Sequence, residues 1–150
     1  MSHWKKGKLK MKCSLSVLQR ALEKIMPQWT GKIQISEAGK LEAINSYDGS
    51  KEQGYNLIVP GGARFGREGG LPDLPYADLG FERIADGTWS FDLDETFFKY
   101  GVDKLKAELL HDIPRVTLQD AIEANGWLVE GSLDGDEIEL IVDPGYETAL

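Results

Sequence analysis

The opening stretch of the chain alternates between charged and apolar positions. Within residues 3–13, the even positions from 6 to 12 carry lysine, namely Lys6, Lys8, Lys10 and Lys12, and the odd positions from 9 to 13 carry the apolar residues Leu9, Met11 and Cys13. A period of two residues places these sets on opposite faces of a β-strand. We therefore expect a strand whose lysine-rich face protects a sheet edge from aggregation, or pairs with acidic residues across the sheet.

The period then changes to that of a helix. Apolar residues recur every three or four positions, at Leu15, Leu18, Leu22 and Ile25. This spacing predicts an amphipathic helix with one buried stripe. Ser14 or Ser16 can cap its start, and Pro27 ends it.

Strand patterns dominate the middle of the chain. Alternating or short apolar runs predict strands at 32–36, 40–45, 54–60, 76–84 and 88–94. Glycine-containing turns separate them, because glycine adopts the positive φ that tight turns require. Ala38 and Gly39 should join the first two strands into a hairpin, and Asp86 and Gly87 the last two. A further turn is predicted at 47–50.

Helical spacing returns from Glu95, with a stripe at Phe98, Val102, Leu105 and Leu109. Pro114 is expected to interrupt this helix. Thr117 and Asp120 have capping-box spacing, which predicts a second short helix over residues 118–124, ended by Gly126 in a left-handed cap. Residues 126–143 form a last predicted hairpin that turns near Asp134 and Gly135.

These elements predict one α+β domain spanning residues 1–150. Its architecture should be an antiparallel β-sheet of hairpins with two helical blocks packed on one face. A chain of 150 residues buries enough surface to form a core without metals or disulfides. Residues 60–75 hold five glycines and three prolines and are expected to form an insertion loop.

Charge is divided unevenly along the chain. Residues 1–72 carry 12 Lys and Arg against 6 Asp and Glu, whereas residues 73–150 carry 5 against 19. The second part is therefore strongly acidic, which disfavours general nucleic-acid binding and favours a protein partner with a basic surface. No apolar run is long enough to span a membrane. The single cysteine, Cys13, excludes an internal disulfide and is interpreted as a small core residue of a protein from the cytoplasm or a virion.

Three groups of residues resemble a known family. Met1 to Trp4, Asp78 to Phe81, and Leu118, Gly126, Trp127, Val129 and the 138–142 strand follow its short motifs. The chain resembles, over residues 1–25 and 76–142, the hypothetical chloroplast reading frame thirty-five family of cyanobacteria, red-algal plastids and other bacteria. Residues 28–75 depart from that pattern. The resemblance implies a small α+β domain without an established catalytic set, and suggests an accessory subunit of a cytosolic ATPase.

The segment 90–95 concentrates carboxylates at Asp92, Asp94 and Glu95. With His111 or Arg83 they could form the site of a carboxylate- or metal-dependent hydrolase. However, the segment lacks the spacing of a calcium loop, and the chain has too few histidines and cysteines for a typical zinc site. Alternation with Phe91 and Leu93 instead predicts that Asp92 and Asp94 lie on a solvated strand face. We predict no catalytic residue, metal or cofactor.

The glycine-rich loop could cradle a phosphate with Arg64 and Arg67, but the Gly-Lys-Ser/Thr ending of a nucleotide loop is missing. The loop is better interpreted as a partner contact, whose candidate residues are Arg64, Phe65, Arg67, Leu71 and Leu74. The sequence thus predicts a non-enzymatic protein-interaction or assembly protein, such as a component of a larger particle, for example a viral one.

Overall fold

The computed structural model describes residues 5–44, 51–61, 77–94, 98, 100–126, 128–132 and 139–143, the last two ranges as backbone. This part of the chain contains two α-helices, a short 3₁₀ helix and antiparallel β-sheets. The predicted α+β class is therefore confirmed.

The largest sheet has five strands, in the order β1 (Lys5–Leu9), β7 (Trp89–Leu93), β6 (Leu79–Arg83), β5 (Leu57–Val59) and β2 (Gln34–Ile35). All neighbouring pairs are antiparallel. The lysine-rich strand β1 lies at an edge of this sheet, which confirms the edge position that its pattern predicts. Strand β7 is second in the order and has a neighbour on each side.

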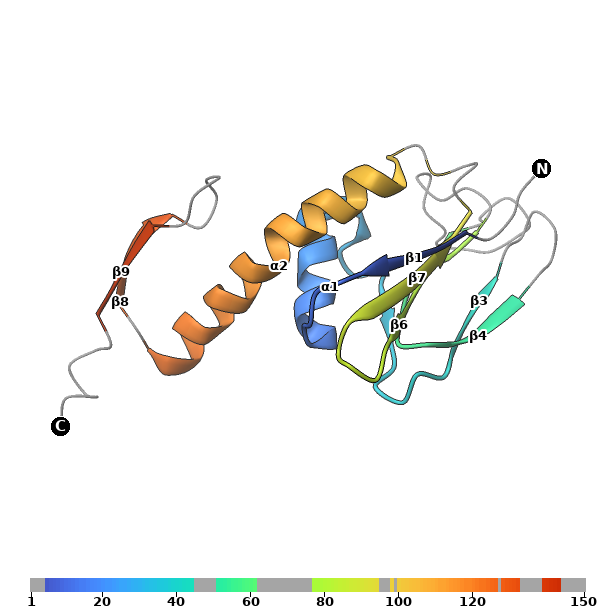
Figure 1. Cartoon of the computed structure of the whole chain (residues 1–150), viewed down its shortest axis with the longest axis horizontal. Coiled ribbons are helices and arrows are strands. Elements are labelled where there is room, and N and C mark those ends of the chain that lie inside the picture. Colours follow the sequence, from blue (N-terminus) through green and yellow to red (C-terminus); the bar gives the residue numbers. More distant parts are fainter. Residues whose placement is uncertain are drawn as a thin grey trace.

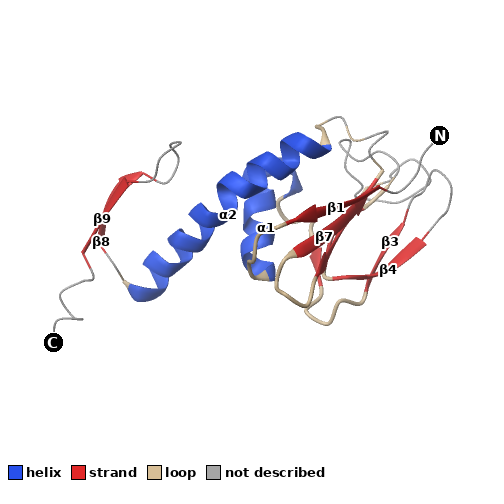
Figure 2. Ribbon diagram, in the orientation of Figure 1, coloured by secondary structure: helices blue, strands red, loops and turns tan. Residues whose placement is uncertain are grey.

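Both helices cover one face of this sheet (Figure 2), namely α1 (Leu15–Ile25), which runs into the 3₁₀ helix η1 (Pro27–Trp29), and α2 (Val102–Asn125). Alternate strand residues enter the core between the layers, among them Leu57, Phe81 and Phe91, which are at most 1% exposed. The Phe81 and Phe91 rings lie 5.5 Å apart in a tilted arrangement. Helices and sheet thus share one apolar core.

The opposite face of the sheet is covered as well. The hairpin of β3 (Leu41–Ile44) and β4 (Lys51–Tyr55) contributes Ala43 and Tyr55 to a second apolar cluster with Ile58 of β5. The aromatic ring of Tyr55 lies so close above Gly80 that a Cβ atom there would come within 2.7 Å of it. Because both faces are covered, β7 is buried along its whole length.

The predicted pairing of 32–36 with 40–45 is wrong. β2 instead pairs with β5, and β3 pairs with β4. The predicted half-buried strand also shortens to two residues, and Ile35 is 49% exposed. Asn56 accounts for much of the changed pairing. Its side chain amide donates hydrogen bonds to the carbonyls of Ser36 and Glu37. Asn56 also separates β4 from β5 within the predicted strand 54–60.

Residues 118–124 are helical, as predicted, but they continue α2. Pro114 lies inside α2 and does not end it, so the prediction of a separate second helix is wrong. Proline has no amide hydrogen, so the carbonyl of Leu110, four residues before Pro114, lacks its helical hydrogen bond. Both residues are exposed, so water can bind this carbonyl instead. Thr117 is consequently not a cap, and its hydroxyl donates to the Ile113 carbonyl at 2.8 Å. The described helix also begins at Val102, later than Glu95.

Several local signals are confirmed. Ser14 caps α1 by accepting a hydrogen bond from the Val17 amide, and Gly126 ends α2 with φ of 65°. Gly87 turns the β6–β7 hairpin with φ of 89°. The last predicted hairpin is present as β8 (Leu128–Ser132) and β9 (Glu139–Asp143). The turns predicted at 47–50 and 134–135 fall outside the described residues.

Helix α2 runs beyond the body of the protein (Figure 1). Its 24 residues span about 36 Å. The buried side chains of α2 end at Val116, and an ion pair from Arg20 of α1 to Asp120 ties the next turn to the body. Figure 1 shows β8 and β9 beyond the C-terminal end of this helix, away from the five-stranded sheet.

Candidate functional site

The carboxylates of Asp92 in β7 and of Asp94 just after it are not on a solvated face, so that prediction is wrong. Asp92 is 7% exposed and Asp94 is 3% exposed. Tyr55 donates its hydroxyl hydrogen to Asp92 Oδ2 at 2.7 Å, and Lys6 Nζ lies 3.7 Å from the same oxygen. The alternation itself is correct, but it cannot reveal that the β3–β4 hairpin covers this face.

The surroundings of Tyr55 fix the state of its hydroxyl. Burial raises the Tyr55 pKa, and the hydrogen bond and negative charge of Asp92 raise it further. The phenol therefore remains protonated and can donate to Asp92 throughout the ordinary pH range. This arrangement links β4, β7 and β1 through three side chains, which is a structural role for Asp92.

The hydrolase hypothesis grouped Asp92 and Asp94 with His111 or Arg83. His111 lies on α2, which covers the other face of the sheet, and its Nδ1 is 2.8 Å from Asp112 Oδ1. Arg83 points instead toward Glu37. Neither side chain is brought to Asp92. Within the described residues, no three His, Cys, Asp or Glu side chains converge in a way that could hold a metal ion.

Asp78, a member of the family-like motif, has a role that the sequence reasoning missed. It is fully buried, and its two carboxylate oxygens accept from the Ile44 and Gly61 amides, each at 2.8 Å. Asp78 therefore holds together the end of β3 and the chain just after β5. The sequence indicated this role only by placing a carboxylate within the apolar run 76–81. The amides that Asp78 binds are too distant along the chain to be predicted from it.

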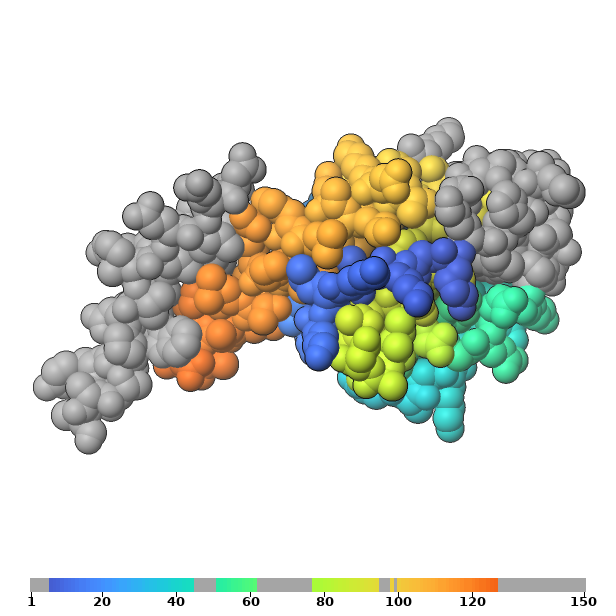
Figure 3. Space-filling model, viewed as in Figure 1, coloured from blue at the N-terminus to red at the C-terminus, as the bar shows by residue number. Residues whose placement is uncertain are grey.

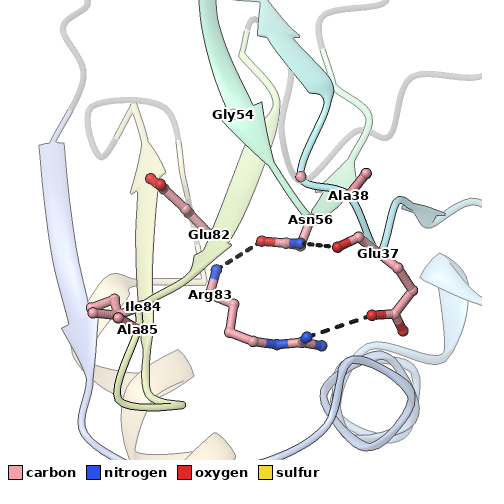
Figure 4. A pocket seen from close by; sticks show the side chains of 9 residues that line it. Glu37, Ala38, Gly54, Asn56, Glu82, Arg83, Ile84 and Ala85 are labelled. Atoms are coloured by element: carbon pink, nitrogen blue, oxygen red, sulfur yellow. Dashed lines mark hydrogen bonds and ion pairs between the residues drawn. The ribbon is translucent and has the colours of Figure 1, made fainter.

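An open groove of about 450 Å³ lies beside Asn56 (Figure 4). Its lining residues are Glu37, Ala38, Gly39, Gly54, Asn56, Glu82, Arg83, Ile84 and Ala85. Arg83 pairs with Glu37 at 3.5 Å, and its guanidinium lies 5.1 Å from the centre of the Trp89 ring. Asn56 uses its amide for backbone hydrogen bonds, including one from the Arg83 amide at 2.9 Å. These polar groups hold the local backbone in place.

Cys13 packs against the main core, in agreement with its interpretation as a small core residue. Its carbonyl accepts a hydrogen bond from Trp89 Nε1 at 3.2 Å. Burial raises the pKa of its thiol above the ordinary value, which disfavours the reactive thiolate.

The five predicted partner contacts, Arg64, Phe65, Arg67, Leu71 and Leu74, lie outside the described residues. Gly61, the last described residue before these contacts, donates its amide hydrogen to Asp78. The predicted loop contacts therefore stay a prediction. No helix in the described ranges combines the length and apolar composition needed to cross a membrane.

Two surfaces of opposite charge remain. We use the term basic edge for β1 and the residues that follow it, where Lys6, Lys8, Lys10 and Lys12 are all exposed. Chain positions 1–22 contain six Lys and Arg and no Asp or Glu. The basic edge therefore offers cationic side chains along the outer strand of the sheet.

We use the term acidic arm for chain positions 116–150, of which the structure describes the last turns of α2 and the two strands β8 and β9. This segment contains nine Asp and Glu and no Lys or Arg. Figure 3 shows the last turns of α2, in orange, projecting from the body. Two of these carboxylates, Asp120 and Glu123, belong to those turns. The charge pattern of the sequence predicted an acidic second half, but not that Asp120 and Glu123 lie on a projecting part of α2.

No protein-family model, curated protein or solved structure matches this chain. The resemblance to the chloroplast reading frame family accordingly stays a prediction.

Proposed function

We propose that this is a non-enzymatic protein-interaction protein that binds a basic protein surface through its acidic arm. The observation that carries the proposal is the concentration of nine carboxylates, without any Lys or Arg, in residues 116–150. An accumulation of one sign of charge attracts a surface of the opposite sign and accelerates encounter with it.

The geometry of the arm supports this function. Helix α2 extends past its last buried residue, Val116, and the two-stranded β8–β9 sheet follows it. Two strands by themselves are marginally stable in water, and further strands or packing are needed for independent stability. A partner that covers or extends this hairpin would supply that packing. The same carboxylates repel nucleic-acid phosphates, so a protein partner fits this surface better.

The test is capture of partners from cells that naturally produce this chain, with a neutralised arm as the comparison. The arm variant replaces Asp134, Asp136, Glu137 and Glu139 by their amides. A matched control replaces four exposed carboxylates of the body: Glu37, Glu52, Glu82 and Asp86. We expect the unmodified protein and the control to capture the same basic protein and the arm variant to lose it.

The captured protein is then purified and its association rate measured at increasing salt. The rate should fall as ionic strength rises, because screening weakens long-range attraction. Equal capture by the arm variant and the control would contradict the proposal, as would a salt-independent rate.

A further inference from the structure

We infer that a second copy of this chain is a partner of the acidic arm, and that β9 of one copy adds to the β1 edge of the next. This inference rests on the proposed function and specifies its partner. The inference is drawn from two features of the same chain: a lysine-rich strand at the edge of the main sheet, and a hairpin in an acidic segment.

Strand β1 is hydrogen-bonded to β7 on one side and is the terminal strand of the described sheet. Such an edge can accept a further strand through its backbone groups. Exposed lysines make the edge selective, since they repel another lysine-rich strand but attract an acidic one. Lys8 and Lys10 supply this charge next to Lys6, which is paired with Asp92.

The arm carries a strand with the complementary pattern. The β8–β9 register places Glu130, Glu139 and Asp143 on one face of the hairpin, together with Leu128, Ser132 and Ile141. The other face holds Val129, Gly131, Leu140 and Val142. In strand β1, Lys6 and Lys8 share one face, and Lys5, Gly7 and the buried Leu9 belong to the other. Strand addition can therefore align Glu139 and Asp143 with Lys6 and Lys8 on one face, and an apolar residue of β9 with Leu9 on the other.

The β8–β9 hairpin of the acidic arm cannot reach the basic edge of its own molecule. Figure 1 shows β1 in the body of the protein and β8–β9 beyond the far end of α2. With α2 about 36 Å long, the two surfaces are held apart. Contact between them requires another copy, either as a reciprocal pair or as a head-to-tail series.

The experiment measures self-association of the purified full chain by sedimentation velocity over a range of concentrations. An edge variant carries Lys8→Glu and Lys10→Glu, and an arm variant carries Glu139→Lys and Asp143→Lys. The control, Lys32→Glu with Lys40→Glu, makes the same charge change as the edge variant at exposed positions of the body. Like charges now face each other in each test variant, so its dissociation constant should rise by about tenfold or more.

The unmodified chain and the control should self-associate, and an equimolar mixture of the edge and arm variants should regain association. The milder pair Lys8→Gln and Lys10→Gln, which leaves the fold less perturbed, should weaken association less than the glutamate pair. A monomeric unmodified chain overturns the inference, as does association that neither variant weakens or a mixture that stays monomeric. If the chain is monomeric but its arm still captures another basic protein, only this inference fails; if it does neither, the proposed function fails too.

Discussion

At the scale of single residues, the buried polar side chains organise the body of the protein. Tyr55 and Asp92 join the β3–β4 hairpin to the main sheet, and Asp78 joins the backbone at Ile44 and Gly61. The sequence predicted which strand face Asp92 occupies, because alternation determines that. It could not predict burial, because burial depends on a hairpin about forty residues away in the chain.

Replacing Tyr55 by phenylalanine should lower the free energy of unfolding by about 1.5–3 kcal/mol. The substitution removes the hydroxyl donor and leaves the buried Asp92 carboxylate without that hydrogen bond. Urea denaturation measures the change. The control, Glu52→Gln in the exposed part of the same strand, should stay within about 0.5 kcal/mol. An equal loss in both variants would show that the hydrogen bond contributes little.

The same variant has a pH signature. Because the Tyr55 pKa is raised in the folded state, its contribution to stability is present below the unfolded pKa of about 10 and is lost as pH rises above it. Tyr55→Phe should therefore lose stability less steeply than the unmodified protein in alkaline solution. Parallel stability curves of the two proteins above pH 10 would contradict this.

At the scale of elements, the turns and caps were easier to predict than the pairing. Ser14, Gly87 and Gly126 act within a few residues of their positions, and all three predictions are confirmed. The pairing of β2 with β5 depends on distant contacts, including those of Asn56, and was not predictable from local signals. Pro114 misled the sequence reasoning because the penalty of an internal proline is tolerated where the helix is exposed.

Pro114→Ala should raise the free energy of unfolding by about 1–3 kcal/mol. Alanine restores an amide that can donate to the Leu110 carbonyl, and it removes the steric clash that proline causes. Urea denaturation measures the gain, with Ala107→Ser at another exposed position of α2 as the control. Unchanged or lower stability would show that the helix is adapted to the proline at this position.

At the scale of the whole molecule, the chain separates positive from negative charge. The sequence predicted the asymmetry, but the fold determines that Lys6 and Lys8 lie on an edge strand, and that Asp120 and Glu123 lie on the projecting end of α2. The Gly/Pro-rich segment 60–75 remains a predicted second contact. The predicted loop residues could not be connected to either surface, because they lie outside the described residues.

Deleting residues 62–70 tests that second contact. The fold should persist, because loop closure depends weakly on length and the deletion retains Gly61, whose amide binds Asp78. The deletion variant should capture the partner more weakly than the full chain does. Its melting temperature, measured by circular dichroism, should stay close to that of the full chain. A deletion variant that folds and retains every partner would remove the loop from the proposed interface.

The central claim, that the β8–β9 hairpin is stabilised by docking on a cationic edge, is tested most directly by amide hydrogen exchange. The measurement compares the purified full chain at low and high concentration, over 128–132, 139–143 and 5–9. The account predicts that exchange in β9 and β1 slows together as concentration rises, and that Lys8→Glu with Lys10→Glu abolishes the slowing. Exchange in the hairpin that is as slow as in the central strands at every concentration would contradict the claim, because the hairpin would then be stable without a partner.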